Sequence, residues 1–294
     1  MRGILKLSQS SPLIPLYFLL GEFPMEATIH LDMLSLFWNI WSNPQTKVFE
    51  VVKYLLKMTD NNSLTWSAHL RIISQLYSLP DPLTLMEGTL WSKEKWKEHI
   101  KAVVTSYHEL SLRKKASRNY KLRFLNVQVS GLSGKPHPVL SWILTTQDVM
   151  RARIHIKMVS GDYLCHDHLA KDRGLDPACR LCQPVLPHPA PKEDLIHLLT
   201  ICKATAETRS RTIPDLNCIA IYFPSNSILD SFSHENLCQF ILDPTSLNLP
   251  LNMRIHPSHP DLSWVMTTCR NICFALHRDR MRQLKHLGYL NLIS

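Results

Sequence analysis

The sequence predicts a mostly α-helical protein: a helical array with a small zinc-binding subdomain of three cysteines and one histidine near the middle of the chain. Of its 294 residues, 45% are hydrophobic, which is enough to bury a substantial core. Glycine is scarce, at 8 residues, and the 19 prolines separate long segments in which apolar residues recur at helical spacing. One short window also carries three cysteines and a histidine at the spacing of metal ligands.

The first 92 residues are predicted to form several helices separated by turns. Apolar periodicity predicts helices over 24–41, 46–58 and 63–77, and Pro80 and Pro82 then open a turn and a short helix. The side chains expected to face inward are Met25, Ile29, Met33, Phe37 and Ile40, then Val48, Val51, Val52, Leu55 and Leu56, then Trp66, Leu70, Ile73 and Tyr77.

A long helix is predicted from Ser92, which occupies the N-cap position, to about Ser117. Thr145 and Asp148 form the pattern of a capping box before another helix, which Gly161 would end. Further helices are expected over 193–211, 234–242 and 261–286, and 218–223 reads as a short strand or a buried run. The stripe of the long helix expected to be buried comprises Trp96, Ile100, Val103, Val104, Tyr107 and Leu110.

Residues 179–202 hold the most specific motif. Cys179 and Cys182 form a Cys-x2-Cys pair, and after fourteen intervening residues His197 and Cys202 form a His-x4-Cys pair. Four such donors can close a tetrahedral shell around Zn²⁺ and leave no position for water, which is typical of a structural site. On an ideal helix His197 and Cys202 would be turned apart by about 140°, so we expect a distorted turn near Cys202 or a swing of its side chain. The alternative is a set of buried cysteines beside an unrelated helical histidine.

The remaining cysteines are scattered and do not resemble a secreted disulfide framework. They indicate an intracellular, reducing compartment, either nucleus or cytoplasm. Cys165, His166 and His168 are candidates for auxiliary ligands, whereas Cys269, Cys273 and His277 share a helix face that we expect to be buried core. No transmembrane helix is expected, because the apolar stretch from Leu13 to Gly21 is too short.

The positive charge is concentrated in the middle of the chain. The net charge is +9, and residues 93–173 hold 16 Lys/Arg against 7 Asp/Glu. Basic residues interleaved with aromatic ones favour non-specific contacts to an RNA or DNA backbone, although a solvated lysine-rich helix face is the alternative. The residues expected to make these contacts are Lys93, Lys95, Lys97, Lys101, Arg113, Lys114, Lys115, Arg118, Arg123, Arg151, Arg153 and Lys157.

Composition therefore divides the chain into four segments. These are an apolar helical segment (1–90), a basic helical segment (91–173), a zinc-binding segment (174–211) and a C-terminal helical segment (212–294). The chain lacks a Gly-rich phosphate loop, a Gly-x-Ser-x-Gly elbow, a His-Glu-x-x-His motif and an Asp-Asp pair, so no enzymatic activity is expected.

The motif resembles the zinc-binding segment at the C-terminal end of reverse-transcriptase polyproteins from LINE-type (non-long-terminal-repeat) retrotransposons of animals. The resemblance rests on Cys179–Cys182, Glu193–Cys202 and Arg209, and it extends to Arg123–Asn126, Lys135–Pro138 and the opening residues Arg2–Leu7.

This resemblance implies a C-terminal fragment with Cys179, Cys182, His197 and Cys202 as zinc ligands. It also implies binding of RNA or DNA and contact with other parts of such a polyprotein. The polymerase domain with its catalytic aspartates is missing, so polymerase activity is not implied. Two alternatives stay open: a protein–protein interaction module, and a relic of an element without a selected function.

Overall fold

A computed structural model describes residues 13–58, 65–128, 134–140, 143, 145–167, 174, 176–184, 190–213, 232–246, 249–251, 254–257 and 259–289. These residues form helices and no strand, with one isolated β-bridge between Ala178 and Lys192, which confirms the mostly α prediction. The run 218–223 and the auxiliary candidate His168 lie outside the described residues. The chain separates into two compact units, Phe23–Lys115 and the remainder, which we call the N-terminal unit and, after its predicted zinc ligands, the zinc unit.

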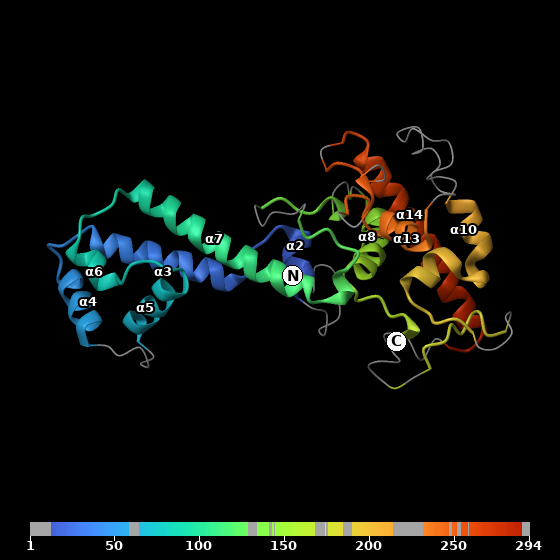
Figure 1. The fold of residues 1–294 in the computed structure, drawn as a ribbon, viewed down its shortest axis with the longest axis horizontal. Helices are drawn as coiled ribbons and strands as arrows, with labels where there is room; N and C mark the ends of the chain where they lie inside the picture. The colour runs from blue at the N-terminus through green and yellow to red at the C-terminus, as the bar shows by residue number, and fades with distance from the viewer. Residues whose placement is uncertain are drawn as a thin grey trace. The chain divides into compact units, whose positions relative to one another are not determined.

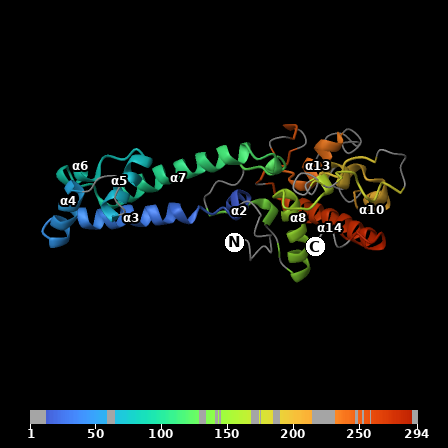
Figure 2. The same cartoon turned by 90° about the horizontal axis from the view of Figure 1, so that it is seen from below.

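The N-terminal unit combines two long helices with three shorter ones (Figures 1 and 2). They are α3 (Met25–Trp41), α4 (Lys47–Met58), α5 (Trp66–Leu76), α6 (Pro82–Glu87) and most of α7 (Lys93–Ser117). The predicted N-cap of α7 is confirmed, because the Ser92 hydroxyl accepts a hydrogen bond from the Lys95 amide at 3.3 Å.

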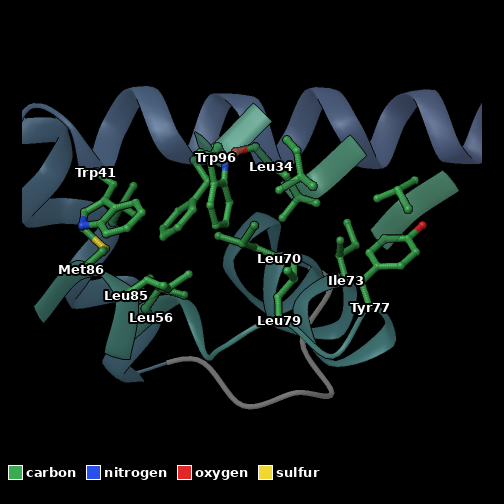
Figure 3. Close-up of a cluster of buried hydrophobic side chains, with 14 of the residues drawn as sticks. Leu34, Trp41, Leu56, Leu70, Ile73, Tyr77, Leu79, Leu85, Met86 and Trp96 are labelled. Carbon is green, nitrogen blue, oxygen red and sulfur yellow. Dashed lines mark hydrogen bonds between the residues drawn. The ribbon is translucent and has the colours of Figure 1, made fainter. Parts of the chain in front are cut away.

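Aromatic and aliphatic side chains from all five helices fill one core in this unit (Figure 3). Trp96 of α7 is 1% exposed and donates its indole N–H to the carbonyl oxygen of Leu34 on α3 at 3.0 Å. Its ring also lies edge-on to that of Trp41, with centroids 5.9 Å apart. These contacts fix the rotation of α3 against α7, because a tryptophan supplies a large apolar area and a single polar atom that needs a partner.

The predicted buried stripes are correct for α5 and partly wrong for α3, α4 and α7. On α3 the buried face carries His30, Leu34 and Trp41, whereas Met25 and Ile29 are exposed. This helix is apolar on several sides, so periodicity alone does not choose its inward face. On α4 the buried residues are Phe49, Val52 and Leu56, and on α7 the stripe continues from Val104 through His108 and Leu112, leaving Tyr107 and Leu110 exposed.

A polar cluster lies within the N-terminal core. The Tyr77 hydroxyl is hydrogen-bonded to His30 Nδ1 at 2.6 Å and to His108 Nε2 at 2.8 Å, and all three side chains are buried. Burial is the main cause that lowers the pKa of both histidines from 6.5. The charge of Glu26 opposes this for both, whereas His69 adds to it for His30, and His30 and Lys115 add to it for His108.

We expect acid to destabilise the N-terminal unit through this cluster. Because the folded histidines bind protons less readily than unfolded ones, the stabilisation is complete above pH 6.5 and falls as the pH drops below that value. Hydrogen exchange of peptides from α3, α5 and α7, corrected for intrinsic rates, should show weaker protection at about pH 5.5 than at pH 7. A His108→Gln variant should show a smaller difference between the two conditions, and an unchanged difference would contradict this account.

The zinc unit is organised around α14 (Leu262–His286), which packs against α8 (Thr146–Val159), α10 (Ala206–Thr212) and α13 (His234–Leu242) (Figure 1). It also contains α2 (Leu13–Leu20) and four single turns: η1 (Tyr120–Leu122), η2 (Pro138–Leu140), η3 (His197–Ile201) and η4 (Lys203–Thr205).

The predicted boundaries of α8 are confirmed at both ends. Thr145 Oγ1 accepts from the Asp148 amide at 3.1 Å, and the Asp148 carboxylate accepts from the Thr145 amide at 3.0 Å, which completes the capping box. Gly161 ends the helix at φ +71°, and a Cβ at this position would lie 3.0 Å from the carbonyl oxygen of Lys121. Both the left-handed backbone and the close approach therefore require glycine.

The face of α14 that carries Cys269 and Cys273 is buried core, as expected. Both side chains are fully buried, and burial raises the pKa of both thiols. The Cys269 thiol donates to the carbonyl oxygen of Phe240 at 3.7 Å, and His277 Nδ1 is hydrogen-bonded to the Tyr163 hydroxyl at 3.0 Å. Within the described ranges, no helix combines the length and apolar character that crossing a membrane requires.

Candidate metal centre

The four predicted ligands come together in the zinc unit. The donor atoms of Cys179, Cys182, His197 and Cys202 all lie within 4.8 Å of one another, and all four residues are buried. Cys182 Sγ lies 3.6 Å from Cys202 Sγ and 3.4 Å from His197 Nε2, and Cys179 Sγ lies 4.0 Å from Cys202 Sγ. Such a buried group of three thiols and an imidazole could hold a metal ion.

The first pair of donors is placed by a tight turn. The amide of Cys182 donates to the carbonyl oxygen of Cys179 at 3.1 Å, so the two residues between them form a knuckle. The Cys179 amide in turn donates to the carbonyl oxygen of Pro191 at 2.7 Å, and the isolated bridge between Ala178 and Lys192 lies beside this bond. These contacts bring the knuckle next to the segment that leads to His197.

The second pair is placed by a π-helical turn. Asp194 caps the segment by accepting from the His197 amide at 2.8 Å, and the chain then forms η3 instead of a continuous α-helix. The Cys202 amide donates to the carbonyl oxygen of His197 at 2.7 Å, which is the i→i+5 bond of a π-turn. This bond places the two donors one turn apart on the same side, so the predicted distortion near Cys202 is confirmed. The predicted helix over 193–211 is interrupted by η4 before α10 begins.

Cys202 is the thiol of the cluster at which negative charge is stabilised. Hydrogen bonds from Cys179 and from His197 lower the pKa of Cys202 below the ordinary value of a thiol, against the effect of burial. The same pairing with Cys202 raises the pKa of Cys179, and burial raises the pKa of Cys182 although the backbone amide of Lys203 donates to its Sγ. Arg209 on α10 interacts electrostatically with Cys182 and Cys202. One thiolate is therefore already favoured, which suits a metal ligand because the metal binds the deprotonated form.

A buried ion pair attaches this centre to α14. Arg280 donates to the Glu193 carboxylate at 2.6 and 3.2 Å, and their side chains are 1% and 0% exposed. Arg280 also donates to the carbonyl oxygen of Leu164 at 3.0 Å, and its guanidinium lies 5.4 Å from the Tyr163 ring centroid. The Glu193 carboxylate accepts in addition from the His166 amide at 3.3 Å.

Apolar contacts complete the attachment. Leu181 and the three cysteines of the cluster pack with Leu284 near the end of α14, and Ala204 and Tyr289 border them. Gln283 donates to the carbonyl oxygen of Ala204 at 2.8 Å. The centre is therefore held by α14, which is more than sixty residues away in the sequence, and this contact could not be read from the motif.

Of the auxiliary candidates, the two described residues, Cys165 and His166, do not belong to the cluster. His166 Nδ1 is 3.3 Å from the carbonyl oxygen of Ala178, and Cys165 is buried with a pKa raised chiefly by burial. Across the described parts of the chain, the group that could hold a metal comprises the four predicted ligands.

The predicted nucleic-acid-binding residues divide between the two units. In the N-terminal unit α7 exposes all of its lysines, with Lys93 lying 5.6 Å from the Trp38 ring centroid and Lys95 lying 4.8 Å from that of Trp91. Arg113 is paired with Glu109. In the zinc unit Arg118 and Arg123 are exposed, whereas the others are half-buried on α8: Arg151, Arg153 and Lys157.

Fold and site together define a mostly helical protein with a buried cluster of three cysteines and one histidine. Comparisons with protein-family models, characterised proteins and solved structures found no match to this chain.

Proposed function

We propose that this chain is a non-catalytic, zinc-stabilised module that binds the backbone of RNA or DNA. The observation that carries the proposal is the convergence of four buried donors, Cys179, Cys182, His197 and Cys202. This centre is the feature by which the chain resembles the C-terminal part of a LINE-type reverse transcriptase. We therefore propose that the chain corresponds to that C-terminal region. We also propose that it contacts other parts of such a polyprotein.

Zinc is the ion that suits the donor set. With Zn–S bonds of about 2.3 Å, the sulfurs of a tetrahedral site lie about 3.8 Å apart. The sulfur–sulfur distances of 3.6 and 4.0 Å in the cluster are close to this value. Thiolates with an imidazole in a closed tetrahedral arrangement favour zinc over hard cations such as Mg²⁺ or Ca²⁺.

The nucleic-acid part of the proposal rests on the exposed lysines of α7. Lys93, Lys97 and Lys101 are exposed and recur at four-residue spacing, so they follow one another along a face of the helix. Exposed lysines can exchange water and counterions for phosphate oxygens at little cost, and such contacts carry no sequence information.

Binding across a salt series tests this function. The intact protein should bind labelled RNA and DNA with an affinity that falls steeply with salt, because each phosphate contact releases condensed counterions. A Lys93→Gln/Lys97→Gln/Lys101→Gln variant should lower the slope of log affinity against log salt by roughly 2, at about 0.7 for each contact to a single strand. If the intact protein binds neither RNA nor DNA even at low salt, the proposal is wrong.

A second candidate function, protein–protein interaction, is favoured by one face of α4. Val48, Val51, Leu55 and Met58 are 56%, 55%, 40% and 66% exposed and follow the i, i+3, i+7, i+10 spacing of a helix-packing seam. A second copy of the chain is the simplest partner, because such a stripe can pack on itself about a two-fold axis. Sedimentation equilibrium should then show self-association that Val51→Glu/Leu55→Glu abolishes, and a strictly monomeric parent protein would exclude this partner.

A further inference from the structure

An arginine-lined groove lies in the zinc unit, and none of the four candidate metal ligands lines it. It has a volume of about 560 Å³ and is formed by residues of α8, α10 and α14. Four arginines line it: Arg151 from α8, Arg211 from α10, and Arg278 and Arg282 from α14. Only Arg151 lies within the basic segment 93–173, so most of this charge comes from parts of the chain that are nearly neutral overall.

The groove has an excess of positive charge. Asp279 is the one carboxylate among its lining residues, against four guanidinium groups. Burial tends to raise the pKa of Asp279, but hydrogen bonds from Thr208, Gln283 and Arg282 lower it overall, so the group is ionised. Counting also Asp148 and Glu207, which pair with Arg151 and Arg211, one positive charge is left over at the groove, and a polyanion would be attracted to it.

Arg151 and Arg211 form ion pairs with carboxylates, and these pairs leave guanidinium N–H groups available to a phosphate. Arg211 pairs with Glu207 at 2.9 Å and Arg151 with Asp148 at 3.7 Å. Glu207 is 84% exposed, and exposed pairs of this kind contribute little to stability, so a phosphate oxygen can replace the carboxylate. Arg278 is exposed, and within the described ranges no carboxylate lies at ion-pairing distance from it.

The walls of the groove also suit the other parts of a nucleotide. Phe274 is half-buried on the same face of α14 as Arg278, one turn away, and Ala275 lies beside it. Thr208 and Asn271 add hydroxyl and amide groups to the lining. Guanidinium groups recognise phosphate in a forked geometry, and an aromatic ring can stack with a base of any sequence.

We propose that this groove binds the phosphodiester backbone of a single-stranded nucleic acid, with Arg211, Arg278 and Arg282 contacting phosphates and Phe274 contacting a base. This inference rests on the proposed nucleic-acid function and assigns it a second contact site. The groove lies on α14, the helix that also holds the metal cluster through Arg280 and Leu284. The cluster therefore supports the helix that presents two of the arginines.

Fluorescence anisotropy of the full chain with labelled oligouridylate and oligothymidylate of equal length tests the groove. An Arg278→Gln/Arg282→Gln variant should bind on the order of tenfold more weakly, with a salt slope lower by roughly 1.4, at about 0.7 for each contact. Lys285→Gln is the matched control, because Lys285 is exposed on α14 and does not line the groove. Unchanged zinc content and circular dichroism show that the variants are folded.

The outcomes separate the groove from the function on which it rests. Equal losses for both oligonucleotides support backbone contacts, and a loss for oligouridylate alone supports the groove with RNA as its ligand. If the arginine variant binds both strands like the parent while the α7 lysine variant is weakened, the groove proposal is wrong and the function stands. If the arginine variant alone is weakened, the groove stands and α7 is not the binding surface. If the parent chain binds neither oligonucleotide, both the groove proposal and the proposed nucleic-acid function are wrong.

Discussion

Replacing Cys182 with serine should abolish metal binding and locally unfold the described residues between 176 and 205. The sulfur of Cys182 lies within 3.6 Å of both Cys202 Sγ and His197 Nε2, so its loss removes a central donor. The knuckle buries Leu181 and the π-turn buries Leu198 and Leu199, whereas structural zinc contributes roughly 10–16 kcal/mol in small zinc-dependent domains. This large contribution is the reason that local order should depend on the ion.

Zinc content measured by a metal-release assay and peptide-resolved hydrogen exchange check this expectation. Peptides from the segment around Cys179 and His197 should lose protection, while peptides of α3 and α5 should not change. Cys273→Ser is the matched control, because that thiol is equally buried on α14 but does not belong to the cluster. Full zinc content and unchanged local exchange in the Cys182→Ser variant would falsify the metal centre.

Replacing Arg280 with methionine should lower the free energy of unfolding of the zinc unit by about 3–5 kcal/mol. The pair is almost fully buried, with Arg280 1% and Glu193 0% exposed, so the variant leaves a carboxylate inside the protein without its partner. Two backbone groups near the centre also depend on the pair, namely the carbonyl of Leu164 and the amide of His166. Urea unfolding followed by circular dichroism measures the change.

Two further variants show whether burial is the cause. Removing both charges with Glu193→Leu/Arg280→Met should recover most of the loss, because no uncompensated charge is left. Arg211→Met is the control with an exposed pair: Arg211 and its partner Glu207 are 67% and 84% exposed, so the change should be about 0–1 kcal/mol. Equal effects of Arg280→Met and Arg211→Met would refute the argument from burial.

Local signals in the sequence predicted most helix positions well. The cap residues Ser92 and Thr145, and Gly161 at the end of α8, act through backbone hydrogen bonds and dihedral angles within a few residues, so they can be read without the fold. The boundaries of α3, α4, α13 and α14 lie within a residue or two of those predicted.

The four candidate metal ligands were also predictable, because their spacings within each pair are short. The distance between Cys179 and Cys182 is set by a turn, and the mismatch of a five-residue spacing with 3.6 residues per turn indicated the distortion that the π-turn of η3 provides. The inward faces were less predictable. Helices α3 and α4 carry apolar residues on more than one side, and only packing selects the face that is buried: α3 packs against Trp96 and Tyr77, and α4 packs against α5 and α6.

The helical class, most helix ends and the four candidate ligands follow from the order of the amino acids alone, because propensity, capping and short spacings act over a few residues. Tertiary packing, in contrast, determines which contacts hold the metal centre. It also determines where the arginine-lined groove lies. The pairing of Glu193 with Arg280 and the assembly of Arg151, Arg211, Arg278 and Arg282 join residues far apart in the chain. No local spacing relates such residues, because their proximity results from how α8, α10 and α14 pack.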